Sequence, residues 1–99
     1  MTLKTINVTT LKQWLKNQEA VLVDVREPSE HAAENIEGAV LLPLGQICKS
    51  ALPDYTGKKL VLHCRKGARG GSACEKLLAE DPTLDIYNLE GGMEAWCHA

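Results

Sequence analysis

Short apolar runs alternate with helical patterns along the chain. Four runs rich in Val, Leu and Ile predict strands, and they cover residues 20–25, 38–44, 59–63 and 84–89. Apolar residues at spacings of three and four predict a helix at 9–18, with Thr9 or Thr10 as its N-cap, and another at about 71–81. Two shorter helices are expected, one that starts at Pro28 and one that follows the glycines at 91 and 92. This alternation predicts an α/β sandwich around a mainly parallel sheet.

Composition narrows the class of protein. Ninety-nine residues suffice for one domain, expected to cover 1–99, and a net charge of −2 argues against a nucleic-acid partner. No apolar stretch reaches the roughly 20 residues of a membrane helix, and "MTLKTINVTT" lacks the apolar core of a secretory signal. The four cysteines form no CxxC pair and no metal spacing. We therefore expect free thiols, no metal or other cofactor, and a cytoplasmic location.

One segment, "HCRKGARGG" at 63–71, concentrates positive charge and glycine around a single cysteine. Cys64 follows the predicted strand 59–63, and ligands gather at the carboxyl ends of strands in such sheets. Glycines at a strand-to-helix turn allow successive amides to face one anion, and Arg65, Lys66 and Arg69 add positive charge. Such surroundings favour a thiolate, so Cys64 is predicted to be an activated nucleophile.

Other candidate residues have simpler interpretations. Cys74 lies on the apolar face of its predicted helix, while Cys48 and Cys97 lack cationic surroundings, with Cys97 the most exposed. His63 should point away from the face that carries Cys64 and is interpreted as a packing residue. The charged group at the end of strand 20–25 is expected to form an internal ion pair rather than to catalyse: Asp24, Arg26, Glu27 and Glu30.

Three blocks of the sequence resemble the single-domain rhodanese family. They are "LVDVREPSEHAAENIEGAVLLPL", "LVLHCRKGARGGSA" and "NLEGGMEAW", and in register they cover nearly the whole chain. The resemblance implies a three-layer sandwich with helices on both faces of the sheet. It also implies a sulfurtransferase in which Cys64 takes a sulfane sulfur from thiosulfate or a persulfide donor and passes it to a thiol or cyanide.

The same resemblance implies roles for the loop residues. The amides of the loop would surround the sulfur, and its cations would attract a small anionic donor. The substrate-binding residues implied in this way are Arg65, Lys66, Gly67, Ala68, Arg69 and Gly70. The acceptor would be a small thiol or a protein.

Loop length separates the alternatives. Counted from the cysteine, the loop runs for six residues from Cys64 to Arg69, as in rhodaneses, whereas related phosphatases and arsenate reductases have one residue more. Two alternatives stay open: a persulfide carrier or interaction module with weak turnover, and, less favoured by the loop, a phosphatase or arsenate reductase.

Overall fold

Five parallel strands form one sheet in the computed structural model, which describes residues 4–99. Their order is β1-β5-β4-β2-β3. The bounds are Thr5–Ile6 for β1, Ala20–Asp24 for β2, Val40–Leu41 for β3, Lys59–His63 for β4 and Ile86–Leu89 for β5. The central strands β2, β4 and β5 are buried on both faces, which explains why they appear in the sequence as continuous apolar runs.

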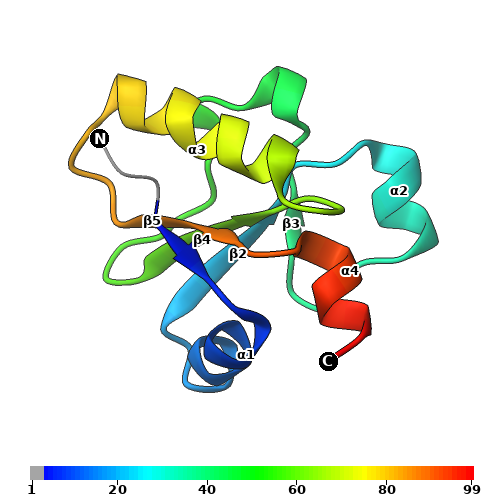
Figure 1. Cartoon of the computed structure of the whole chain (residues 1–99). Coiled ribbons are helices and arrows are strands. Elements are labelled where there is room, and N and C mark those ends of the chain that lie inside the picture. Colours follow the sequence, from blue (N-terminus) through cyan, green and yellow to red (C-terminus); the bar gives the residue numbers. More distant parts are fainter. Residues whose placement is uncertain (1–3) are drawn as a thin grey trace.

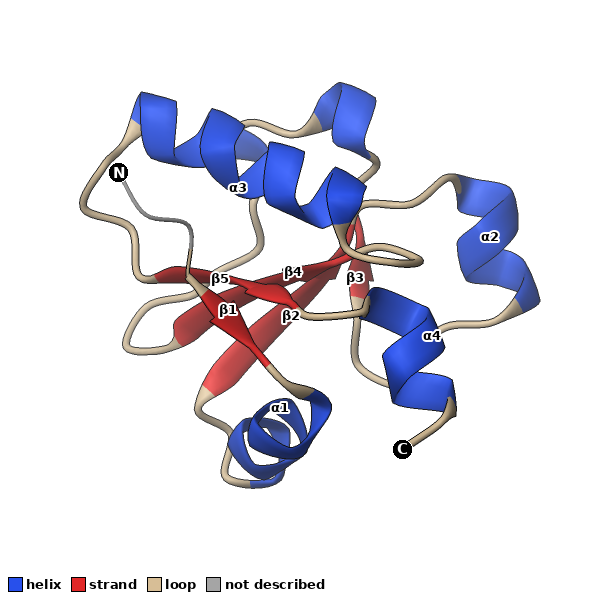
Figure 2. Cartoon of the chain, viewed as in Figure 1, coloured by secondary structure: helices blue, strands red, loops and turns tan. Residues whose placement is uncertain are grey.

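Helices cover both faces of this sheet, as Figures 1 and 2 show. One face packs against α3 (Ala68–Glu80) and the short 3₁₀ turn η1 (Leu44–Gln46), which a second turn, η2 (Lys49–Ala51), follows in the chain. The opposite face packs against α1 (Val8–Lys16) and α4 (Gly92–Cys97). The predicted three-layer α/β fold with a parallel sheet is therefore confirmed.

Alternation along β4 divides the core into two halves. Leu60, Leu62 and Cys64 belong to the cluster under α3, whereas Val61 belongs to the cluster under α1 and α4. His63 is fully buried and, by the same alternation, faces away from Cys64.

Several predicted boundaries were wrong. α1 is capped by Asn7, whose side chain accepts a hydrogen bond from the Thr10 amide, and not by Thr9 or Thr10. The strand expected at 38–44 pairs only at Val40–Leu41, at the sheet edge. The two-residue edge strand β1 was not predicted, because so short a segment carries no periodicity.

The largest shift affects the helix that follows the cysteine. It was expected from about residue 71 but begins at Ala68, with Gly67 at its N-cap. Gly70 and Gly71 therefore lie inside the first turns of α3, although glycine disfavours a helix interior. Three of the predicted loop residues, Ala68, Arg69 and Gly70, are thus the first three residues of the helix.

Parallel pairing brings the functional segments to one edge. Asp24 of β2 pairs with His63 of β4, so both strands end at the same level. The Cys64 loop, α2 (Pro28–Ala33) and the start of α4 lie together at this edge, as Figure 1 shows.

Candidate functional site

The Cys64 sulfur lies where β4 turns into α3. The Gly67 amide donates a hydrogen bond to Cys64 Sγ at 3.0 Å. Gly67 has φ of +122°, a conformation that side-chain-bearing residues rarely adopt, so glycine is what allows this amide to turn back toward the sulfur. An amide aimed at sulfur favours a negative charge on it.

Cys64 borders a small pocket of about 200 Å³, which Arg65, Lys66, Ala68 and Arg69 also line. Cys64 itself is only 1% exposed. The structure therefore brings together five of the predicted site residues around the pocket and contributes Gly67 through its amide. A reagent must enter this pocket to meet the sulfur.

Gly70 is the predicted site residue that lies behind the loop. It is buried in α3, and a Cβ at this position would collide with the Asn88 side chain. Asn88 in turn donates from Nδ2 to the Gly67 carbonyl at 2.9 Å. Gly70 thus makes room for the side chain that fixes Gly67, which explains why a glycine occupies this position inside the helix.

Backbone hydrogen bonds from the start of α4 also fix the sulfur loop. The Met93 amide donates to the Cys64 carbonyl at 2.8 Å, and the Glu94 amide donates to the Arg65 carbonyl at 3.0 Å. A Cβ on Gly92 would collide with the Cys64 and Arg65 backbone. Gly92, the first residue of α4, therefore permits direct backbone contact between this helix and the loop.

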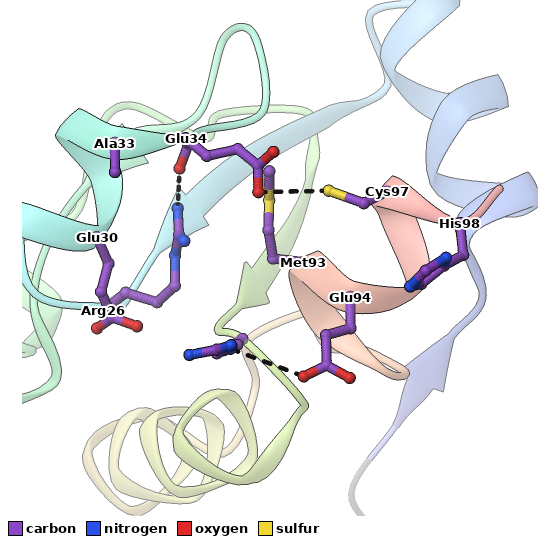
Figure 3. A pocket seen from close by; sticks show the side chains of 9 residues that line it. Arg26, Glu30, Ala33, Glu34, Met93, Glu94, Cys97 and His98 are labelled. Atoms are coloured by element: carbon purple, nitrogen blue, oxygen red, sulfur yellow. Dashed lines mark hydrogen bonds and ion pairs between the residues drawn. The ribbon is translucent and has the colours of Figure 1, made fainter.

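Each cation of the loop faces a carboxylate. Arg69 binds Glu30 of α2 with two hydrogen bonds, at 2.7 and 3.0 Å, and this pairing holds the pKa of Glu30 down at about 2. Arg65 and Lys66 lie 3.7 and 3.8 Å from Glu94 of α4, whose side chain is labelled in Figure 3. The sequence pattern did not indicate these partners.

A buried charged cluster supports the same edge. Asp24 is fully buried and accepts hydrogen bonds from the Arg26 side chain at 2.8 to 3.1 Å, while His31 Nδ1 lies 2.9 Å away. Burial would raise the pKa of Asp24, but the hydrogen bonds from Arg26 and His31 lower it to about 2. The expected internal ion pair is therefore present between Asp24 and Arg26. His31, for which no partner was predicted, also contacts Asp24.

Glu27 and Glu30, the two other acidic residues of this segment, have structural roles at the start of α2. Glu27 caps α2 in a capping box with Glu30. Because Glu30 also binds Arg69, the start of α2 is tied directly to the sulfur loop.

His63 lies against this cluster, with Nε2 3.9 Å from Asp24 Oδ1. Burial lowers the pKa of His63, and its Nδ1 lies 3.3 Å from the Cys64 carbonyl. The ring is therefore a neutral, buried spacer between β2 and the residue that carries the sulfur.

A second pocket of about 320 Å³ opens between α2 and α4 (Figure 3). Arg65 lines both this pocket and the loop pocket, so the two adjoin. Cys97 lies in its wall, 3.5 Å from Glu34 Oε1. Glu34 also accepts a hydrogen bond from Arg26 at its carbonyl, which links the pocket wall to the buried cluster.

The other cysteines differ from Cys64. All four are free thiols. Cys74 is fully buried in the core, where burial raises its pKa to about 12, and Cys97 is exposed, both as predicted. Within residues 4–99, no three His, Cys, Asp or Glu side chains gather to form a metal site, and no helix there is long and apolar enough to cross a membrane.

Comparison with known proteins decides the family. The model of the rhodanese-like domain matches residues 7–99. The chain belongs to the rhodanese-like domain family. The resemblance inferred from three sequence blocks is thereby confirmed.

Individual relatives include an uncharacterized protein and a putative sulfurtransferase. The chain is 41% identical over 95 residues to the uncharacterized protein slr1261 of Synechocystis, matching 96% of this chain but 52% of that protein, so the chain spans about half of that relative. It is 34% identical over 97 residues to the putative sulfurtransferase YtwF of Bacillus subtilis, covering 97% of this chain and 92% of YtwF. A rhodanese-related protein from Thermoplasma volcanium superposes with a TM-score of 0.80 at 27% identity, covering 96% of this chain and 91% of that one.

Proposed function

We propose that this rhodanese-like domain, residues 1–99, is a sulfurtransferase that carries sulfur as a persulfide on Cys64. The observation that supports this most directly is the Gly67 amide donating to Cys64 Sγ inside a six-residue cationic loop. The naming of relatives such as YtwF as putative sulfurtransferases is consistent with it.

The chemistry proceeds in two displacements. The Cys64 thiolate attacks the outer sulfur of thiosulfate, a new S–S bond forms at Sγ, the donor's S–S bond breaks, and its electron pair leaves with sulfite. An acceptor thiolate or cyanide then attacks the outer sulfur of the persulfide and restores the Cys64 thiolate. The negative charge passes from Sγ to the outer sulfur in the first step and returns to Sγ in the second, so fixed donors around this position stabilise both anionic states.

The loop residues have different roles in this reaction. The Gly67 amide stabilises the sulfur anion, while Arg65, Lys66 and Arg69 line the pocket through which the anionic donor enters. Ala68 forms the apolar part of the pocket wall and Gly70 admits Asn88 behind it. The acceptor is a thiol, either small or on a protein. The free thiols of Cys48, Cys64, Cys74 and Cys97 suit a reducing compartment, and we propose the cytoplasm.

The test combines turnover with detection of the intermediate. With thiosulfate and cyanide, the wild-type protein should form thiocyanate, Cys64→Ala should not, and the exposed Cys97→Ser should match wild type. Mass spectrometry of the intact protein should show one added sulfur that dithiothreitol removes and that Cys64→Ala lacks. Thiocyanate formation by Cys64→Ala at the wild-type rate would overturn the proposal. A stable persulfide with slow turnover would instead favour the carrier function.

A further inference from the structure

Each cation of the sulfur loop is paired with a carboxylate. Arg69 has both terminal nitrogens bound to Glu30, and Arg65 and Lys66 share Glu94. Three positive charges at the pocket therefore face two negative ones. Since the nucleophile is itself an anion when it reacts, little net positive charge remains for a donor.

The two carboxylates differ in strength. Glu30 and Arg69 are both about two-thirds buried, with 28% and 35% of their side chains exposed, and their paired hydrogen bonds form a charge-assisted fork. Glu94 is more exposed, and its contacts with Arg65 and Lys66 are longer than hydrogen bonds. Solvent and salt screen such exposed pairs, so Glu30 should act more strongly on the pocket than Glu94.

We propose that Glu30 and Glu94 are specificity-determining residues that disfavour dianionic sulfur donors and leave the loop suited to donors with a single negative charge or none. This inference rests on the proposed sulfur transfer. Its physical basis is that the Coulomb energy is proportional to the product of the charges, so a fixed carboxylate opposes a dianion twice as strongly as a monoanion at the same place.

Two donors of nearly the same shape isolate this effect. Thiosulfate carries two charges, and methanethiosulfonate, in which a methyl group replaces one oxygen anion, carries one. In both, the Cys64 thiolate takes the outer sulfur and the S–S bond breaks. The electron pair leaves with sulfite in the first case and with methanesulfinate in the second, so the charge of the donor is also that of the leaving group.

Glu30→Gln and Glu94→Gln remove the charge and keep the shape. A glutamine at 30 still offers one oxygen to the Glu27 amide and to Arg69 Nη1, which preserves the capping box and one of the two bonds to Arg69, while the acceptor for Arg69 Nη2 is lost. Glu94 touches the loop cations only at ion-pair distance, so its replacement tests charge without a lost hydrogen bond. Glu19→Gln is the matched control, since Glu19 precedes β2 at the opposite end of the sheet.

The expected result is a charge-dependent gain in kcat/KM. Glu30→Gln should raise the value for thiosulfate about tenfold and for methanethiosulfonate about threefold, so that the logarithm of the gain is twice as large for the dianion. Glu94→Gln should give smaller gains with the same two-to-one ratio of logarithms, and Glu19→Gln should give none. Added salt should shrink these gains. Equal gains for both donors, or no gain in either variant, would overturn the inference.

A binding measurement separates this outcome from failure of the proposed function. Sulfate and methanesulfonate, which transfer no sulfur, can be tested as protectants of Cys64 against iodoacetamide in wild type and Glu30→Gln. Sulfate should protect the variant at a clearly lower concentration than it protects wild type, while methanesulfonate changes less. If wild type used neither donor but protection followed this pattern, sulfur transfer would be refuted and the charge selection retained. An unchanged pattern would overturn the selection.

Discussion

The Gly67 amide points at the Cys64 sulfur from 3.0 Å, and Asn88 fixes the Gly67 carbonyl on the opposite side of the same residue. One glycine therefore links the reacting atom to β5, the strand that lies next to β4 in the sheet. The sulfur depends on backbone geometry as much as on nearby charge.

Gly67→Ala should slow alkylation of Cys64 by iodoacetamide. Space exists for the added Cβ, whose nearest neighbours lie at 3.8 and 3.9 Å, but the φ of +122° does not suit alanine. We expect a loss of about 1–3 kcal/mol in the free energy of unfolding and displacement of the amide from the sulfur. The control is Gly57→Ala, which has φ of +74° and open space around it. It should lose stability without slowing alkylation; equal slowing in both would contradict the role of Gly67.

Gly92→Ala should destabilise the protein and disturb Cys64 together. The new Cβ would collide with the backbone of Cys64 and Arg65, so α4 must move away from the loop. Overpacking of this kind costs about 1–3 kcal/mol, measurable by urea denaturation. Gly45→Ala is the control, because nothing lies within 4 Å of its added Cβ. A Gly92 variant as stable as the Gly45 variant would show that α4 does not hold the loop.

Asp24→Asn should be severely destabilising. It leaves the Arg26 guanidinium, which is 5% exposed, without its buried carboxylate. Removing one partner of a buried pair costs about 3–5 kcal/mol in the free energy of unfolding. In contrast, Asp85→Asn breaks the exposed pair with Lys4 and should cost about 0–1 kcal/mol. Similar losses in the two variants would mean that Asp24 and Arg26 contribute no more than a surface pair.

Stability should fall in two pH windows. Burial lowers the pKa of folded His63 below 6.5, so the unfolded chain takes up the proton first, and stability declines once the pH drops below about 6.5. The pKa of Asp24 falls from 3.8 to about 2, so its contribution is complete above pH 4 and is lost as the pH falls through 2.

Urea midpoints measured from pH 8 to pH 2 check both windows. His63→Gln should flatten the decline that begins near 6.5 and keep the one below 4, because only the first involves the imidazole. A wild-type midpoint that rises as the pH falls from 7 to 5 would contradict the stated direction for His63.

Sequence patterns predicted the central strands and the Cys64 loop, but they did not predict which carboxylates pair with the cations of the loop. β2, β4 and β5 are buried on both faces, and such strands are recognisable as apolar runs. The Cys64 loop was found because its cations and glycines are adjacent in sequence. Glu30 lies 39 residues from Arg69, so only the folded chain pairs them.

The start of α3 was predicted three residues too late because a contact made only in the fold decides it. Gly70 and Gly71 argue locally for a loop, since glycine weakens a helix. In the fold, Gly70 provides the space that the Asn88 side chain occupies, and packing outweighs propensity. His31 likewise has no local signal, because its partner Asp24 becomes a neighbour only when α2 returns to the end of β2.

The backbone bonds from Met93 and Glu94 to the carbonyls of Cys64 and Arg65 also give the last helix a mechanical part in the reaction. The two bonded carbonyls belong to the consecutive peptide groups that follow Cys64, so the position of α4 and the path of the chain leaving the sulfur-bearing residue are coupled through the backbone. A displacement of this helix would therefore be transmitted to the sulfur loop without passing through any side chain.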